Sequence, residues 1–270
     1  MRISSFYLTL IILSLRFIQP VSAAQTPIGI LGIPSETDVL LPMLSHKRTT
    51  RILGIAFISG DMDGVPVALA RSGIGKVNAA MTAALMIDHF HPSFLLFTGS
   101  AGALNPSLSP GDVVIGERTA EHDVGTITAQ GMQHEATYGI NGRNPLFFPA
   151  DPTLLKAAQM AAKSISLQPV DTGMGSHIPR IITGVIVTGD LFVASEAENS
   201  ELRTYFHADA TEEEGAAVAQ VCWETRIPFL AIRSISDNAN GQTPVNYRKF
   251  YKLAANNSAL LVKAIIADLK

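Results

Sequence analysis

Three carboxylates stand where apolar patterns of the chain end, at positions suited to chemistry. Glu36 follows a Pro-Ser step, Glu214 closes an acidic run, and Asp237 stands two residues after an apolar strand pattern. In such a set one carboxylic acid can give a proton while another carboxylate takes one, as general acid–base catalysis requires. Each residue alone also suits a structural role, because carboxylates accept hydrogen bonds from free backbone amides at helix starts and turns.

The structural alternative is most explicit at Glu214. Thr211 stands three residues earlier, and a Thr-x-x-Glu spacing at the start of a helical pattern is a capping box. Two glycine turns, over 72–77 and 98–102, could bring backbone amides close to a ligand. Glycine turns are common, however, and 72–77 lacks the full dinucleotide or P-loop spacing. These residues alone leave capping and chemistry open.

The elements that position these groups predict an α/β fold. Apolar runs alternate with helical patterns, as expected for a mostly parallel sheet covered on both faces. We expect strands over 28–31, 51–57, 65–70, 94–98, 112–115, 181–187 and 229–235, and helices over 76–89, 152–164, 198–206, 214–225 and 245–269. The irregular segment 122–149 is expected to be a loop that completes a site. No repeat or linker divides the chain, which predicts one domain over 24–270.

Composition limits the class of partner. The 270 residues are 47% hydrophobic and 16% charged with a formal charge of -3, and the scattered Lys and Arg residues form no basic stripe for nucleic acid. A small-molecule ligand is therefore expected. Cys222 is the only cysteine, so no internal disulfide forms even in an oxidising compartment.

The first 23 residues have the pattern of a secretory signal. A positive start precedes an apolar stretch over 6–15, and small residues lead to Ala23, which predicts a signal peptide over 1–23 and a periplasmic or secreted protein. An uncleaved anchor is the alternative. Arg16 and Gln19 disfavour it, because a bilayer span needs about 20 apolar residues. We expect no membrane association after cleavage.

Seven motifs, taken in order, resemble the signatures of the 5′-methylthioadenosine/S-adenosylhomocysteine nucleosidases. The resemblance covers nearly the whole chain after the signal. The matching segments are 28–32, 72–77, 98–102, 111–114, 188–190, 214–219 and 233–237.

This resemblance implies a fold, an assembly and an activity. The fold is a three-layer α/β/α sandwich around a mixed, partly barrel-like sheet, and the assembly is a homodimer in which the neighbour helps to close the site. The implied reaction is hydrolysis of a purine nucleoside that releases adenine, with no cofactor and no metal.

The resemblance also implies roles for individual residues. Asp237 would serve the purine N7, Glu214 would hold the ribose hydroxyls, and Glu36 would orient and deprotonate the attacking water. Ser100 and Arg233 would position that water and its carboxylate. The implied substrate-binding residues are Ile74, Ala101, Gly102, Phe192, Val193, Glu213 and Tyr247.

Hydrolysis is favoured over phosphorolysis by two positions. Related phosphorylases carry arginines that grip phosphate where this chain has Phe97 and the stretch 32–35, neither of which offers a cation. An exported phosphorylase remains one alternative. An exported nucleoside-binding or storage protein without turnover is the other.

Two positions depart from the family pattern. The spacing from Gly32 to Glu36 is one residue shorter than in bacterial relatives, so Thr37 or Asp38 competes for the base position by counting. The Ile-Pro-Ser-Glu lead-in favours Glu36. The second departure is Glu213, which replaces a methionine that lies against the sugar; a carboxylate there predicts a wetter pocket, unless its side chain rotates into solvent.

Overall fold

The computed structural model describes residues 26–140, 142–171 and 175–269. The signal peptide predicted over 1–23 lies outside these residues. Within the described ranges, no helix combines the length and hydropathy needed to cross a membrane.

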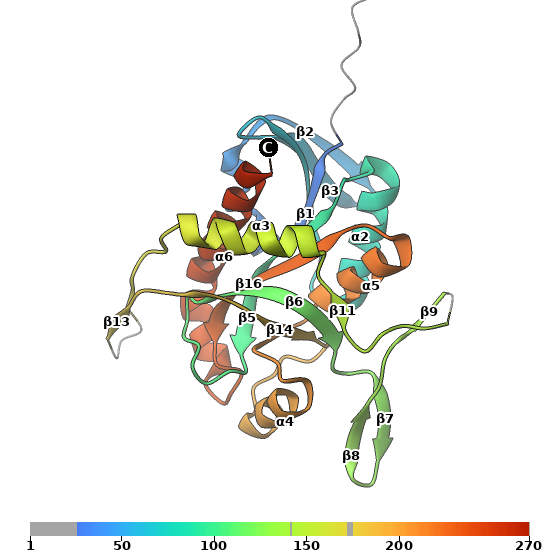
Figure 1. Cartoon of the computed structure of the whole chain (residues 1–270), viewed down its shortest axis with the longest axis vertical. Helices are drawn as coiled ribbons and strands as arrows, with labels where there is room; N and C mark the ends of the chain where they lie inside the picture. The colour runs from blue at the N-terminus through green and yellow to red at the C-terminus, as the bar shows by residue number, and fades with distance from the viewer. Residues whose placement is uncertain (1–25, 141, 172–174, 270) are drawn as a thin grey trace, which may run out of the picture.

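A ten-stranded mixed sheet forms the centre of the molecule (Figure 1). Along most of the sheet the strands follow the order β11-β6-β14-β15-β5-β1-β4-β3-β2, and β16 pairs with both β5 and β6. Five strands, β6, β14, β15, β5 and β16, therefore pair in a closed barrel, which confirms the predicted partly barrel-like sheet. The bounds are β1 Ile28–Gly32, β2 Leu44–Ile52, β3 Ile55–Met62, β4 Val65–Arg71, β5 Leu95–Ala103, β6 Val113–Glu121, β11 Phe148–Pro149, β14 Ile181–Thr188, β15 Ala210–Glu212 and β16 Phe229–Asp237.

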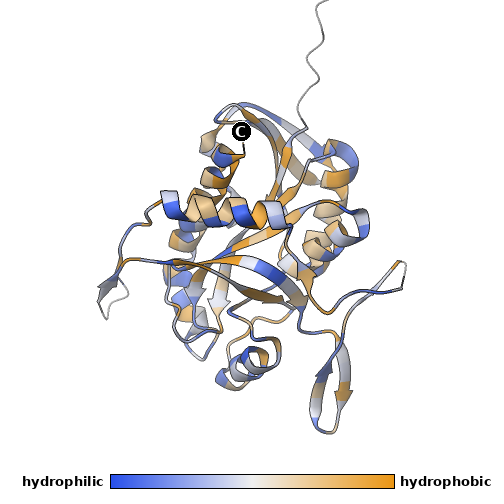
Figure 2. Cartoon of the chain, viewed as in Figure 1, coloured by the Kyte–Doolittle hydropathy of each residue, from blue (hydrophilic) through white to orange (hydrophobic). Residues whose placement is uncertain are grey.

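Helices cover both faces of this sheet, which confirms the three-layer architecture. Helices α3 and α6 pack on one face in the cluster that contains Ile30 and Leu96, and α2 and α5 pack on the other with Leu31 and Leu95. Neighbouring residues of one strand thus face opposite layers, which explains why the strands are apolar at consecutive positions. The helices are α1 Pro34–Thr37, α2 Lys76–Phe90, α3 Pro152–Ser164, α4 Glu196–Phe206, α5 Gly215–Thr225 and α6 Thr243–Asp268, with a 3₁₀ turn at Leu41–Met43. Figure 2 shows apolar residues concentrated on the central strands and polar residues on outer helix surfaces.

The predicted strand over 51–57 is wrong. Leu53 and Gly54 have φ angles of 48° and 84° and form a tight turn between β2 and β3, which pair as a hairpin. Two successive positive φ values suit a mirror-image hairpin turn, whose twist matches that of its strands. The apolar residues on both sides of this glycine made the hairpin look like one continuous strand.

The segment 122–149 is also more ordered than predicted. Strands β7 Gly125–Thr128 and β8 Gly131–His134 form a hairpin, and β9 Tyr138–Gly139 pairs with β10 Gly142–Arg143. Both pairs extend away from the body of the molecule (Figure 1). A further short pair, β12 Val170–Asp171 with β13 Ser176–His177, precedes β14.

Candidate active site

The predicted chemical groups meet at one edge of the sheet. Strands β1, β4, β5 and β16 run parallel to one another, so their carboxyl ends bring distant parts of the chain together there, as in other open α/β sheets. Glu36 follows β1, the 72–77 turn follows β4, and Asp237 ends β16. Residues 98–102 lie within the second half of β5.

Glu36 is buried and held by three donors. Its Oε1 accepts hydrogen bonds from the amide of Ser100 at 2.7 Å and from the Ser100 hydroxyl at 2.8 Å, and its Oε2 accepts one from the Ile33 amide at 3.2 Å. Burial raises the pKa of this carboxyl, although Arg233 and the Ser100 donors act in the opposite direction. A carboxyl with a raised pKa is suited to take a proton near neutral pH.

The two competitors of Glu36 lie outside this cluster. The Thr37 hydroxyl donates to the carbonyl oxygen of Ile33, as in a helical turn, and Asp38 pairs with Arg71 at the surface. Glu36 is therefore the carboxylate that the structure brings to the site.

The Arg233 guanidinium lies beneath the cluster and is fully buried. It pairs closely with Glu212, and its nitrogens lie 3.7 Å from Glu36 Oε2 and 3.5 Å from Glu214 Oε2. The ring of Phe97 packs against the guanidinium, with its centroid 4.3 Å from the guanidinium carbon. One cation is thus shared among three carboxylates, which offsets part of the cost of burying them.

This approach depends on a glycine. A Cβ atom on Gly99 would lie 2.2 Å from both Arg233 Nη1 and Glu36 Oε2. Only a residue without a side chain lets the arginine and the carboxylate meet across β5. The turn predicted over 98–102 is wrong, because these residues continue β5; their small size is required instead for packing of the charged groups.

Glu214 points into the site and does not belong to a capping box. It occupies the N-cap position of α5 without a side-chain hydrogen bond to that helix, and its Oε1 accepts from the Gly75 amide at 3.0 Å. Thr211 lies in β15, and its buried hydroxyl has no hydrogen-bond partner among the described residues. Burial, followed by the charge of Glu212, raises the pKa of Glu214 to about 8.

Glu212 performs the capping, a role that the sequence pattern does not predict. Its carboxylate accepts from the amides of Glu214 and Gly215 at 2.8–3.1 Å and from the Thr188 hydroxyl. It also provides the closest ion pair to Arg233. Its position inside a run of three glutamates gave no sign of which one would turn inward.

Asp237 is placed by a bulge. The pairing of β16 with β5 shifts between Ile235 and Asp237, and such a bulge re-aims a side chain at the end of a strand. The carboxylate accepts from the Ser236 hydroxyl at 2.7 Å and from the Ala239 amide at 2.9 Å, so the turn role and the site role coexist. Burial raises the pKa of Asp237, and its hydrogen-bonding partners are all uncharged.

These groups border a pocket of about 350 Å³. Every predicted site residue lines it except Arg233, which supports the carboxylates from below. The lining consists of Ile33, Glu36, Ile74, Ser100, Ala101, Gly102, Leu191, Phe192, Val193, Thr211, Glu212, Glu213, Glu214, Ser236, Asp237, Thr243, Tyr247 and Arg248. No residue of 122–149 is in this set, so the expectation that this segment completes the site is wrong for the single chain.

The mouth of the pocket is aromatic and partly open. The rings of Phe192 and Tyr247 meet edge to face with centroids 6.0 Å apart, and 51% of Phe192 and 60% of Ile74 remain exposed. Such faces suit stacking on a flat base or contact with an apolar substituent. Burial, with Glu36 and Glu214 next, raises the pKa of Tyr247 to about 12, so its hydroxyl stays protonated.

Glu213 lines the pocket, so rotation into bulk solvent is not what the structure shows. Its side chain is half-buried, and burial together with the charges of Glu212 and Asp190 raises its pKa. Among the described residues, His, Cys, Asp and Glu side chains form no group of three or more placed to hold a metal ion.

Comparison with known proteins places this arrangement in a family. The sequence pattern of the phosphorylase superfamily matches residues 30–267. The 5′-methylthioadenosine/S-adenosylhomocysteine nucleosidase of Psychromonas ingrahamii is 38% identical over 90% of this chain and 99% of its own length. The chain belongs to the phosphorylase superfamily, among the 5′-methylthioadenosine/S-adenosylhomocysteine nucleosidases.

Solved structures share the fold. The Neisseria meningitidis nucleosidase, crystallised with methylthio-immucillin-A, superimposes with a TM-score of 0.78 at 35% identity, covering 90% of this chain and 99% of that one. Futalosine hydrolase of Helicobacter pylori reaches the same TM-score at 29% identity, covering 90% and 97%. The resemblance found from the seven motifs is confirmed.

The raised pKa of Glu214 predicts a pH-dependent effect on stability. In the folded chain this carboxyl stays protonated up to about pH 8, whereas in the unfolded chain it ionises near 4.5. The stability that it contributes is therefore complete below about pH 4.5 and is lost as pH rises toward about 8. Glu214→Gln removes that loss, so we expect its melting temperature to exceed that of the unchanged protein by a margin that grows over this range.

Thermal denaturation at intervals from about pH 5 to about pH 8 measures the margin. Glu117→Gln, at an exposed carboxylate, is the matched control and should show no such trend. A margin for Glu214→Gln that shrinks as pH rises would contradict the assignment.

Proposed function

We propose that this protein hydrolyses the N-glycosidic bond of adenine nucleosides with 5′ substituents, of the methylthioadenosine and adenosylhomocysteine type. The observation that carries the proposal is the convergence of Glu36, Glu214 and Asp237 on one pocket, in three different hydrogen-bonding environments. The relatives named for this reaction match nearly their whole length.

Asp237 and Glu36 divide the proton transfers. As the bond between the anomeric carbon and the purine nitrogen breaks, negative charge develops on the purine, and Asp237 donates a proton to N7. Water adds to the anomeric carbon, and Glu36 accepts the proton that this water loses. Free adenine and a 5′-substituted ribose result. The neutral donors around Asp237 and the cation beside Glu36 suit these different roles.

Glu214 holds the ribose. Its carboxyl is fixed by the Gly75 amide, and in its ionised form it accepts hydrogen bonds from both ribose hydroxyls and supports the positive charge that develops on the sugar. Phe192 and Val193 contact the base, and Ile74 with Tyr247 contacts the sugar and its 5′ substituent. The fully buried Arg233 is neutralised by carboxylates and cannot grip a phosphate dianion, which favours water as the nucleophile.

Adenine release tests this function. We expect adenine and free 5′-substituted ribose from methylthioadenosine in phosphate-free buffer, with kcat lowered on the order of 10²-fold or more in Asp237→Asn and Glu36→Gln. Asp38→Asn, which alters a surface ion pair, should retain full activity. Dependence on phosphate with formation of ribose 1-phosphate would indicate a phosphorylase, and tight binding without turnover would indicate a storage protein.

We also propose that the protein is a homodimer whose partner covers the pocket mouth. Apolar side chains are exposed there and along α2: Leu191 is 56% exposed, Val77 77% and Met81 41%. Val77 and Met81 are four residues apart and share one helix face. Exposed apolar side chains beside an open site are typical of an interface.

Charge placed on that face should dissociate the dimer. We expect sedimentation velocity to show a dimer for the unchanged protein and a monomer for the double variant Val77→Glu/Met81→Glu, with a raised KM. Met160→Glu, on the outer side of α3 with 57% exposure, is the control and should remain dimeric. A monomer in the unchanged protein would contradict the proposal.

We further propose export to the periplasm or the exterior, supported by the signal pattern over residues 1–23. N-terminal sequencing after expression of the full chain should identify Ala24 as the first residue of the exported form. Leu10→Arg, which interrupts the apolar stretch, should retain the protein in the cytosol. An unchanged chain that keeps Met1 and stays in the cytosol would overturn this proposal.

A further inference from the structure

A closed ring of hydrogen bonds lies beside the pocket and outside the catalytic set. The Lys76 ammonium donates to Asp123 Oδ1 at 2.6 Å, and the Asp190 amide donates to Asp123 Oδ2 at 2.9 Å. The ring closes where the Lys76 amide donates to Asp190 Oδ1 at 2.8 Å. Three segments that are far apart in the sequence are thereby tied at one point.

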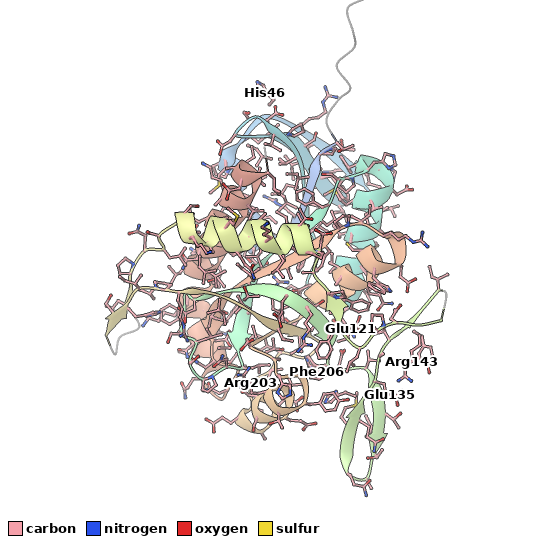
Figure 3. The ribbon with its side chains drawn as sticks, in the orientation of Figure 1. His46, Glu121, Glu135, Arg143, Arg203 and Phe206 are labelled. Atoms are coloured by element: carbon pink, nitrogen blue, oxygen red, sulfur yellow. The ribbon has the colours of Figure 1, made fainter. Side chains whose placement is uncertain are left out.

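The ring is also anchored to the sheet. The Lys76 ammonium donates to Glu121 Oε2 at 2.8 Å, and only 18% of the lysine side chain and 8% of the glutamate side chain are exposed. Figure 3 shows Glu121 at the end of β6, where the chain passes toward β7 and β8. A shielded lysine between two carboxylates is a stronger constraint than a surface pair, because removal of the cation leaves two like charges unpaired.

Each of two ring members adjoins a residue of the pocket. Gly75 directly precedes Lys76, and its amide is the donor that fixes Glu214. Asp190 directly precedes the lining residues Leu191, Phe192 and Val193. The fit at Gly75 is tight, because its φ is 91° and a Cβ there would lie 2.9 Å from Asp190 Oδ1. The ring thus spans the sugar end and the base end of the pocket.

We propose that Lys76, through Asp123 and Asp190, is a positioning residue that holds the Gly75 amide against Glu214 and the 191–193 segment against the base. It touches neither end of the pocket itself. This proposal rests on the proposed function for its kinetic consequences, since they assume that Glu214 binds ribose. Its structural consequence, a locked backbone at 75–76 and 190–193, does not depend on turnover.

Breaking the ring at either of two points should have the same effect. Lys76→Met removes the cation and keeps the length of the side chain, whereas Asp190→Ala removes an anion. We expect each variant to raise KM for methylthioadenosine on the order of tenfold and to lower kcat less. The double variant should lose about as much as either single variant, because a ring that is already open cannot be opened again.

The pH profile separates positioning from a general charge effect. The charged groups that act on Glu214 are Glu212, Arg233 and Glu36, and the Gly75 amide lowers its pKa. Loss of that amide should move the ascending limb of kcat/KM to higher pH in both variants. If only the removed charge acted on Glu214, the ascending limb would move to higher pH in Lys76→Met and to lower pH in Asp190→Ala.

Hydrogen exchange of the unliganded protein gives the readout that is independent of turnover. We expect faster exchange in peptides that cover 73–78 and 189–194 in both variants. Lys263→Met breaks a surface pair with Asp63 and is the control that should change nothing. Lys76→Arg keeps a cation and should recover part of the protection. If Lys76→Met does not fold, the comparison of Lys76→Arg and Asp190→Ala with the unchanged protein still tests the proposal.

Unchanged exchange at both segments, or additive losses in the double variant, would overturn the proposal. If the unchanged protein releases no adenine while the variants still exchange faster, the ring stands and the proposed function fails.

Discussion

The site depends on one buried cation. The Arg233 guanidinium, which the described residues shield completely from solvent, lies against Phe97 and among Glu36, Glu212 and Glu214. Without it, the negative charges of these carboxylates would lie close together with no cation between them. Burial of the arginine is tolerable for the same reason, because each charge compensates the others. The small residues at 99–102 follow from this constraint, since the arginine and Glu36 meet across β5 directly over Gly99.

The carboxylates share a raised pKa but differ in what surrounds them. Glu36 has the arginine and the Ser100 donors, Glu214 has the Gly75 amide, and Asp237 has only neutral partners. An acid that must give a proton to a leaving group and a base that must accept one from water require different surroundings in the same pocket. The fold provides them, because Asp237 is re-aimed by a bulge in β16 while Glu36 lies in the short helix α1 that follows β1.

The conformation of the pocket is maintained from outside it. The Lys76 ring joins the start of α2, the end of β6 and the segment after β14, which lie far apart in the sequence. Loops that bind ligands are otherwise among the less stable parts of a fold. A shielded ion pair at their base allows the pocket mouth to remain open, as the exposure of Ile74 and Phe192 indicates, without loss of order at the catalytic groups.

The sequence by itself determined the fold class, most helices, and the set of carboxylates that meet. The helix predicted over 152–164 agrees with α3 because an Asp-Pro start and an amphipathic pattern are local signals. The seven motifs in order identified the family. The sequence predicts Glu36, Ser100, Glu214 and Asp237 as site residues, and the structure places all four around one pocket.

The tertiary structure alone decided which of several equivalent residues points inward. Counting along the chain left Glu36, Thr37 and Asp38 as competitors, and only the packing of β1 against β5 shows that Ser100 reaches Glu36. The same holds for Glu212, one of three consecutive glutamates, whose role follows from Arg233 on another strand. The capping box at Thr211 was a sound local pattern that sheet pairing overrode. Contacts between residues distant in sequence depend on strand register, and a local pattern contains no information about register.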